Sequence, residues 1–355
     1  MTPLSQNIVD QISTIEPPSE QGRQRARAHL DTLTKPLGSL GRLEDLAAQI
    51  VAIRGERITE PNNKGVYIFA ADHGITAEGV SAYPREVTHQ MVLNFLTGGA
   101  AINVLARLQG MELWIVDAGV DADCEVHPRL IQAKVRRGTR DFTVEAALSE
   151  LECRAAIDQG RRVVERVVPP DGNTLVLGEM GIGNTAAAAL LMHGLTGVPL
   201  HECIGRGTGL DDAGLLRKQD ILRAACARRA PPQDPIELLT EFGGCEIAML
   251  AGAVLGAAER RHLVIIDGFT VTVAAALAAR VAPAVLDYCV FGHCSQEQAH
   301  RALLEHLGVK PLLDLDMRLG EGSGAALALS VVRAAVALFN EMATFEGAGV
   351  SKKIE

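Results

Sequence analysis

The sequence lacks the cysteine spacing that a disulfide framework or a structural zinc site requires. Its seven cysteines are scattered over 355 residues, and no two of them form a Cys-x-x-Cys pair. Such an irregular set is typical of reduced thiols, so we expect a cytoplasmic protein. His-x-x-x-His and His-Glu-x-x-His patterns are absent too, and for this reason no metal site is expected.

Excess positive charge, a basic leader and long apolar runs are also missing. The chain carries 34 Lys and Arg against 43 Asp and Glu, a net charge of −9, which argues against a nucleic-acid partner. Its first residues have neither the basic start nor the apolar stretch of a signal peptide. The most apolar stretch, residues 247–258, is too short to cross a bilayer and predicts a buried helix. No membrane partner is expected.

The sequence itself divides into two regions with different hydrophobic patterns. Residues up to about 60 show helix-like spacing over 23–30 and 40–54, with a Pro- and Gly-rich turn at 35–41. Beyond them, short apolar runs alternate with longer helical patterns; the runs lie at residues 66–70, 113–116, 174–177, 263–266 and 288–291. Their continuous apolar character predicts strands buried on both faces, in a mainly parallel sheet covered by helices. The expected fold class is therefore α/β.

A glycine and a polar or acidic residue follow every predicted strand. These continuations begin at residues 71, 117, 178, 267 and 292. In an open parallel sheet the carboxyl ends of the strands share one edge, which is where ligands bind. The sequence thus predicts a ligand site at this edge before any single motif is considered.

The first glycine-rich loop follows the third predicted strand and leads into a helical run. Its residues are Gly178, Glu179, Met180, Gly181, Ile182, Gly183, Asn184 and Thr185. Glycines allow backbone N–H groups to face an anion, and the following helix N-terminus favours phosphate. The pattern is neither a P-loop nor the Gly-x-Gly-x-x-Gly dinucleotide motif. A phosphate site and a tight strand–helix turn without a ligand are both compatible with it.

The second loop alternates glycines with polar residues and precedes a helix. It consists of Gly205, Arg206, Gly207, Thr208 and Gly209, a pattern compatible with a phosphate nest. Asp211 or Asp212 is expected to cap the helix. Lys218 lies about two turns into it. Taken by itself, this position favours a solvated lysine over a cation that reaches back to the ligand.

The third loop places a glutamate between glycines, in the order Arg318, Leu319, Gly320, Glu321, Gly322, Ser323, Gly324. Such a glutamate can approach a substrate closely and act as a general base once a partly dry pocket raises its pKa. Taken alone, a turn glutamate near a helix N-terminus is the simpler interpretation. As the third such loop in one chain, it favours group transfer from a phosphorylated sugar, in which positioning and one base suffice.

Together these segments resemble the nicotinate-nucleotide–dimethylbenzimidazole phosphoribosyltransferase family of cobalamin lower-ligand synthesis. The resemblance runs through residues 35–44, 71–74, 79–84, 94–103, 178–185, 205–212, 267–269, 317–325 and 344–351. It implies that the 5-phosphoribosyl group of nicotinate mononucleotide passes to 5,6-dimethylbenzimidazole with inversion at C1′, giving α-ribazole 5′-phosphate and nicotinate. Glu321 matches the family's general base. No cofactor or metal is implied, since the donor's pyridinium is already a good leaving group.

The resemblance also implies the remaining site residues and the architecture. Phosphate and ribose would contact Glu179, Gly181, Gly183, Asn184, Thr185, Gly205, Gly207, Thr208, Gly209, Lys218 and Ser295, and the base would contact Ser81, Tyr83, Gln90, Met180, Leu319 and Gly320. The family pattern is a homodimer with a large Rossmann-like domain, here residues 61–304, and a small helical domain built from residues 1–60 and about 305–355. The chain departs from the pattern at Ala186, where a second threonine is usual, and at Gln298-Ala299.

Two other interpretations stay open at this point. One is a different nucleotide-dependent α/β enzyme, such as an oxidoreductase, against which the missing Gly-x-Gly-x-x-Gly motif counts. The other is a catalytically silent nucleotide- or base-binding protein, which would not need an intact Glu321 loop.

Overall fold

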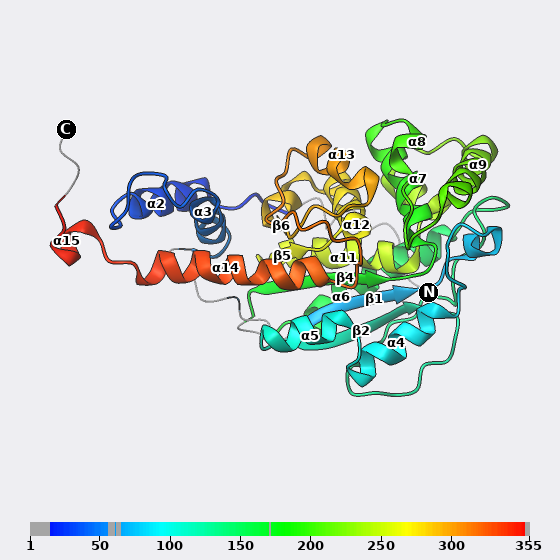
Figure 1. Cartoon of the computed structure of the whole chain (residues 1–355), viewed down its shortest axis with the longest axis horizontal. Helices are drawn as coiled ribbons and strands as arrows, with labels where there is room; N and C mark the ends of the chain where they lie inside the picture. Colours follow the sequence, from blue (N-terminus) through cyan, green and yellow to red (C-terminus); the bar gives the residue numbers. More distant parts are fainter. Residues whose placement is uncertain (1–14, 56–60, 62–64, 170–171, 352–355) are drawn as a thin grey trace, which may run out of the picture.

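One parallel sheet forms the centre of the molecule (Figure 1). The computed structural model describes residues 15–55, 61, 65–169 and 172–351. The strands are β1 (Gly65–Ala71), β2 (Glu112–Gly119), β3 (Leu130–Gln132), β4 (Thr174–Met180), β5 (Leu263–Ile266) and β6 (Cys289–Phe291). All neighbours pair in parallel, in the order β3-β2-β1-β4-β5-β6. This is the doubly wound Rossmann order, and its switch point lies between β1 and β4.

The five predicted runs are all strands, with small differences at their ends. β4 continues to Met180, so Glu179 belongs to the strand and not to the turn after it. The three-residue β3 was not predicted because so short a segment shows no periodicity. All seven residues of β1 are buried, which confirms that the sheet is covered on both faces.

Helices make up most of the remaining described chain. They are α2 (Glu20–Leu30), α3 (Arg42–Arg54), α4 (Val87–Thr97), α5 (Ala101–Leu108), α6 (Glu150–Val167), α7 (Asn184–Thr196), α8 (Leu200–Cys203), α9 (Asp212–Arg228), α10 (Pro235–Phe242), α11 (Cys245–Glu259), α12 (Phe269–Val281), α13 (Gln298–His306), α14 (Ser323–Glu341) and α15 (Phe345–Ala348), with short 3₁₀ helices η1 (Gly74–Glu78) and η2 (Pro283–Tyr288). The apolar stretch 247–258 lies within α11 and is buried throughout. The predicted buried helix is therefore confirmed.

Helix α14 links the sheet to the helices near the chain ends. It packs on β4 and β5 and also on α3, which in turn packs on α2. Leu33 forms an isolated bridge with Thr344. Figure 1 shows α2, α3 and α15 at the narrow end of the molecule, away from the sheet. Because α14 contacts both groups, the domain division near residue 305 stays a prediction, and residues 1–14 and 56–60 lie outside the described part.

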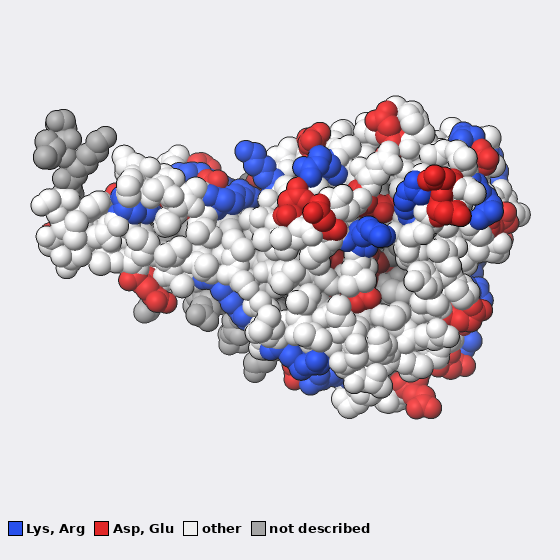
Figure 2. Space-filling model, viewed as in Figure 1, with Lys and Arg blue, Asp and Glu red and all other residues white. Residues whose placement is uncertain are grey.

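Two helical stretches are long and apolar enough, by length and composition, to cross a membrane. They are Val87–Leu108 and Ser323–Glu341, of whose apolar windows 33% and 56% are buried inside the protein. A core helix of a soluble protein passes the same test, so this finding carries little weight. Figure 2 shows acidic and basic side chains interspersed over one face. That the chain has no membrane or nucleic-acid partner stays a prediction.

Candidate active site

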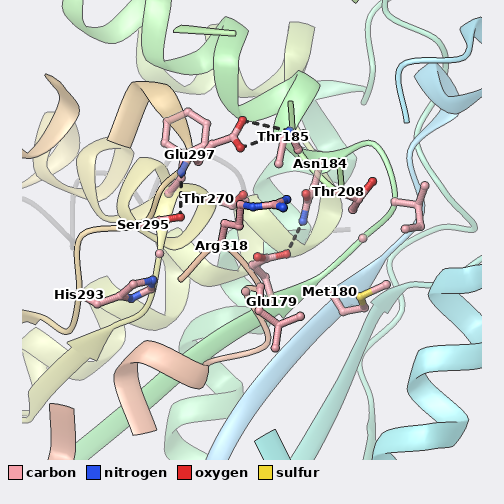
Figure 3. Close-up of a pocket in the computed structure, with 17 residues that line it drawn as sticks. Glu179, Met180, Asn184, Thr185, Thr208, Thr270, His293, Ser295, Glu297 and Arg318 are labelled. Atoms are coloured by element: carbon pink, nitrogen blue, oxygen red, sulfur yellow. Dashed lines mark hydrogen bonds between the residues drawn. The ribbon is translucent and has the colours of Figure 1, made fainter. Parts of the chain in front are cut away.

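A pocket lies at the carboxyl edge of the sheet, where the sequence predicts a ligand site (Figure 3). Its walls come from the turn between β4 and α7, the second glycine-rich loop, the start of α12, the loop after β6 and the loop before α14. The lining residues are Glu179, Met180, Gly181, Ile182, Asn184, Thr185, Gly207, Thr208, Gly268, Phe269, Thr270, His293, Ser295, Glu297, Arg318, Leu319 and Gly320. All three glycine-rich loops therefore meet in one place.

The first loop brings a carboxyl and an amide together at the pocket wall. Asn184, at the start of α7, donates its Nδ2–H to Oε2 of Glu179, and Figure 3 shows the two side chains facing each other. Burial, followed by the charges of Asp267 and Glu246, raises the pKa of Glu179 to about 8. Glu179 is therefore mainly a protonated acid at neutral pH.

The second loop lies against the start of α7 and is tied to it by a buried lysine. Asp211 caps α9 by accepting a backbone N–H of the first turn at 2.7 Å, which confirms the expected cap. Lys218 is fully buried, so the interpretation of it as a solvated lysine is wrong. Its Nζ donates to Thr185 Oγ1 at 2.9 Å and to the Gly205 carbonyl oxygen at 3.1 Å. Burial lowers the pKa of Lys218 to about 8, and the charge of Glu297 opposes this effect.

The third loop holds Glu321 in a strained, left-handed turn. Its φ is +62°, and Gly320 and Gly322 on either side have φ +80° and +78°. A residue with a Cβ adopts this conformation at a cost, and only where its surroundings enforce it. Asp267, directly after β5, enforces it by accepting the N–H of Gly322 at 3.0 Å. The same carboxylate accepts two N–H groups of the first turn of α14 at 2.7 and 3.1 Å.

The carboxyl group of Glu321 lies in dry surroundings. The residue is 7% exposed, and its Oε2 has no hydrogen-bond partner among the described residues. Burial and then the charge of Asp267 raise the pKa of Glu321 to about 7. Glu321 is not itself one of the lining side chains; it directly follows Gly320, which is. A carboxylate with this pKa can accept a proton near neutral pH.

The residues predicted to border the base are only partly brought together. Met180, Leu319 and Gly320 line the pocket. Ser81 lies near the second loop, with its Oγ 3.3 Å from Thr208 Oγ1. Outside the lining are the exposed Tyr83 and Gln90. Of the residues predicted to hold phosphate and ribose, those absent from the lining are Gly183, Gly205, Gly209 and Lys218.

Several lining side chains have no role predicted from the sequence. Arg318, Glu297 and Thr270 are among them, together with His293, whose Nδ1 lies 3.7 Å from Asp267 Oδ1. Arg318 has no hydrogen-bond or ion-pair partner in the described part of the chain, and Figure 3 shows its side chain in the pocket. Glu297 follows the predicted Ser295 by two residues, and this proximity was the available signal. The described residues include no cluster of three or more His, Cys, Asp or Glu that could hold a metal ion.

Comparisons with known proteins identify the family. A family model described as Phosphoribosyltransferase matches residues 15–350. The nicotinate-nucleotide–dimethylbenzimidazole phosphoribosyltransferase of Cupriavidus necator is 53% identical over 341 residues, which cover 96% of this chain and 99% of that protein. The chain belongs to this phosphoribosyltransferase family. The resemblance inferred from the motifs is confirmed.

Two further similarities agree with membership of the phosphoribosyltransferase family. The protein of the same name from Dechloromonas aromatica is 53% identical over 327 residues, or 91% of this chain and 94% of that protein. The crystal structure of CobT from Thermus thermophilus matches with a TM-score of 0.90 and 44% identity, covering 94% of this chain and 100% of that one. The predicted Rossmann-like fold is confirmed by this match and by the strand order.

Proposed function

We propose that this phosphoribosyltransferase moves the 5-phosphoribosyl group of nicotinate mononucleotide to 5,6-dimethylbenzimidazole, in the assembly of the cobalamin nucleotide loop. The products are α-ribazole 5′-phosphate and nicotinate. The observation that carries the proposal is the buried, unpartnered carboxylate oxygen of Glu321, held on a strained turn beside two glycine-rich loops. The names of the related proteins support the choice of both substrates.

The chemistry needs one base and good positioning. One ring nitrogen of the acceptor attacks C1′ on the face opposite nicotinate, while Glu321 takes the proton from the other ring nitrogen. The bond between C1′ and the nicotinate nitrogen breaks, and its electron pair neutralises the pyridinium. The configuration at C1′ is therefore inverted. A base with a pKa of about 7 is well matched to this proton transfer at neutral pH.

The two glycine-rich loops provide the donor side of the pocket. The start of α7, with Asn184 and Thr185, and the loop around Gly207 line this side of the pocket, where the helix N-terminus favours a phosphate. Buried Lys218 supplies a positive charge beneath them. Met180 and Leu319 supply the apolar wall for the planar acceptor.

We further propose a cytoplasmic homodimer with the two-domain division given above. In support of a self-contact, α4 and α5 carry exposed apolar side chains, with Leu93 44%, Val104 55% and Leu108 74% exposed. Apolar side chains gathered on adjacent helices favour a protein interface. Sedimentation equilibrium of the purified protein measures its oligomeric state directly. A monomer at micromolar concentration would contradict the proposed homodimer.

The test of activity mixes the purified protein with nicotinate mononucleotide and dimethylbenzimidazole and follows α-ribazole phosphate by mass spectrometry. We expect product with wild-type protein and little with Glu321→Gln. Absence of product where both substrates are seen to bind would overturn the function. Near-normal turnover of Glu321→Gln would instead assign the base to solvent or to the ionised fraction of Glu179.

A further inference from the structure

A carboxylate of the protein occupies the centre of the second glycine-rich loop. Glu297, just before α13, accepts the backbone N–H of Gly207 at 3.3 and 3.2 Å through its two carboxylate oxygens (Figure 3). Its own N–H donates to Ser295 Oγ at 3.2 Å, which fixes where the side chain starts. A Cβ on Gly205 would lie 1.9 Å from Oε1 of Glu297. The loop is therefore shaped around this carboxylate.

The electrostatics of the loop make Glu297 a substitute for an external anion. Lys218 lies directly beneath, fully buried, and has no carboxylate within ion-pair distance in the described chain. The Glu297 charge is nevertheless the one that favours its protonated form. A Cβ on Gly207 would lie 3.6 Å from Nζ of Lys218, so the ammonium lies beside the glycine whose N–H Glu297 accepts.

A phosphate dianion and the Glu297 carboxylate cannot both accept the Gly207 N–H beside Lys218. The Gly207 N–H has one hydrogen to donate, and two buried anions would face a single buried cation. A second buried anion without a partner cation is destabilising, because a dry site does not solvate its charge. The two anions therefore compete.

We infer that Glu297 is an internal ligand of the phosphate-binding loop, and that the donor's 5′-phosphate displaces it, so that binding of a phosphorylated donor is coupled to release of Glu297 from Gly207. The inference rests on the proposed function for the identity of the donor. A nucleoside lacks the anion that exchanges with Glu297, so it leaves the hydrogen bond between Glu297 and Gly207 in place. Glu297 therefore weakens the binding of inorganic phosphate and of the nucleotide, and leaves the binding of the nucleoside unchanged.

The test measures the dissociation constants of inorganic phosphate, nicotinate mononucleotide and nicotinate riboside by calorimetry in phosphate-free buffer. The proteins are wild type, Glu297→Gln, Glu297→Ala and the control Glu305→Gln, which changes an exposed carboxylate on α13. We expect inorganic phosphate and nucleotide to bind about tenfold more tightly to Glu297→Ala, and less so to Glu297→Gln, whose amide oxygen still accepts a weaker hydrogen bond. The control should match wild type.

Two results would overturn the inference. If Glu297 instead binds ribose hydroxyls, both variants bind nucleotide and riboside more weakly by similar factors. Their affinity for inorganic phosphate then stays that of wild type. If Glu297 only stiffens the loop, all three ligands bind more weakly, and by similar factors. Unchanged acceptor affinity and a circular dichroism spectrum like that of wild type show that the variants are folded. Lack of α-ribazole phosphate from wild-type protein would refute the proposed function separately, since binding of inorganic phosphate requires no turnover.

Discussion

Replacing Glu321 with glutamine should cost activity and increase stability at the same time. The side chain keeps its size but loses the ability to take a proton, so turnover should fall by roughly 10²–10⁴-fold, the usual contribution of a general base. Donor binding should remain, because the proposed donor side of the pocket is built from the other two glycine-rich loops. The stability gain follows from the pKa of the carboxyl in the folded protein.

The magnitude comes from the difference between the folded and unfolded states. The pKa of Glu321 rises from 4.5 to about 7 because the carboxyl is buried and Asp267 lies nearby. The folded state thus binds more protons than the unfolded state between these values, and the stability of the wild type falls as pH rises through this window. At about 1.4 kcal/mol per unit, the loss by pH 8 reaches at most about 3 kcal/mol. Glutamine does not ionise and avoids this loss.

The assay is denaturant unfolding at pH 5 and pH 8, for wild type, Glu321→Gln and the control Glu341→Gln. Glu341 is exposed and is the last residue of α14, the helix that begins just after the Glu321 turn. We expect Glu321→Gln to be more stable than wild type at pH 8 and close to it at pH 5. If the free energy of unfolding of Glu321→Gln has the same pH dependence as that of wild type, Glu321 does not lie in a dry, anionic environment. This conclusion holds whatever the effect of the substitution on turnover.

Further predictions concern the groups around Glu321 and around the second glycine-rich loop. Lys218→Ala should mainly raise the KM for the donor, and in the wild type this KM should rise above pH 8, as Lys218 loses its charge; an effect confined to the acceptor KM would contradict the placement of phosphate. Asp267→Asn removes a negative neighbour of Glu321, so the acidic limb of the pH profile of kcat should move to lower pH; a shift to higher pH would refute this coupling. Gly178→Ala places a Cβ 2.4 Å from the Gly322 nitrogen and should destabilise the protein by about 1–3 kcal/mol in thermal unfolding; an unchanged melting temperature would show that the contact is loose.

Most of the fold could be predicted from hydrophobic patterning. A parallel sheet buried on both faces needs continuous apolar runs, and all five runs are strands. The carboxyl-edge site followed from the residues that come after each strand, because parallel strands end at one edge. β3 could not be predicted from three residues, and its position beside β2 depends on the tertiary structure.

The site was harder to predict where a side chain's environment comes from distant segments. Lys218 has the helical spacing of a surface lysine, and its burial depends on α7 and the second loop closing over it. The left-handed turn at Glu321 was not predicted, because the conformation requires Asp267 from another strand. Glu297 carries no motif of its own and meets Gly207 only through the folding of some ninety intervening residues.

Helix α14 connects the turn that carries Glu321 to the helices near the chain ends. The helix is 19 residues long and starts directly after the turn, while at its far end the Phe339 carbonyl oxygen lies 3.1 Å from His29 Nε2 of α2. At 1.5 Å per residue, a tilt of about 2° about the far end displaces the turn by about 1 Å. A displacement of that size can change a rate by roughly 10²-fold. We therefore expect substitutions at the α2–α14 contact to change acceptor preference and turnover without touching a substrate, which makes this remote contact a target for directed evolution.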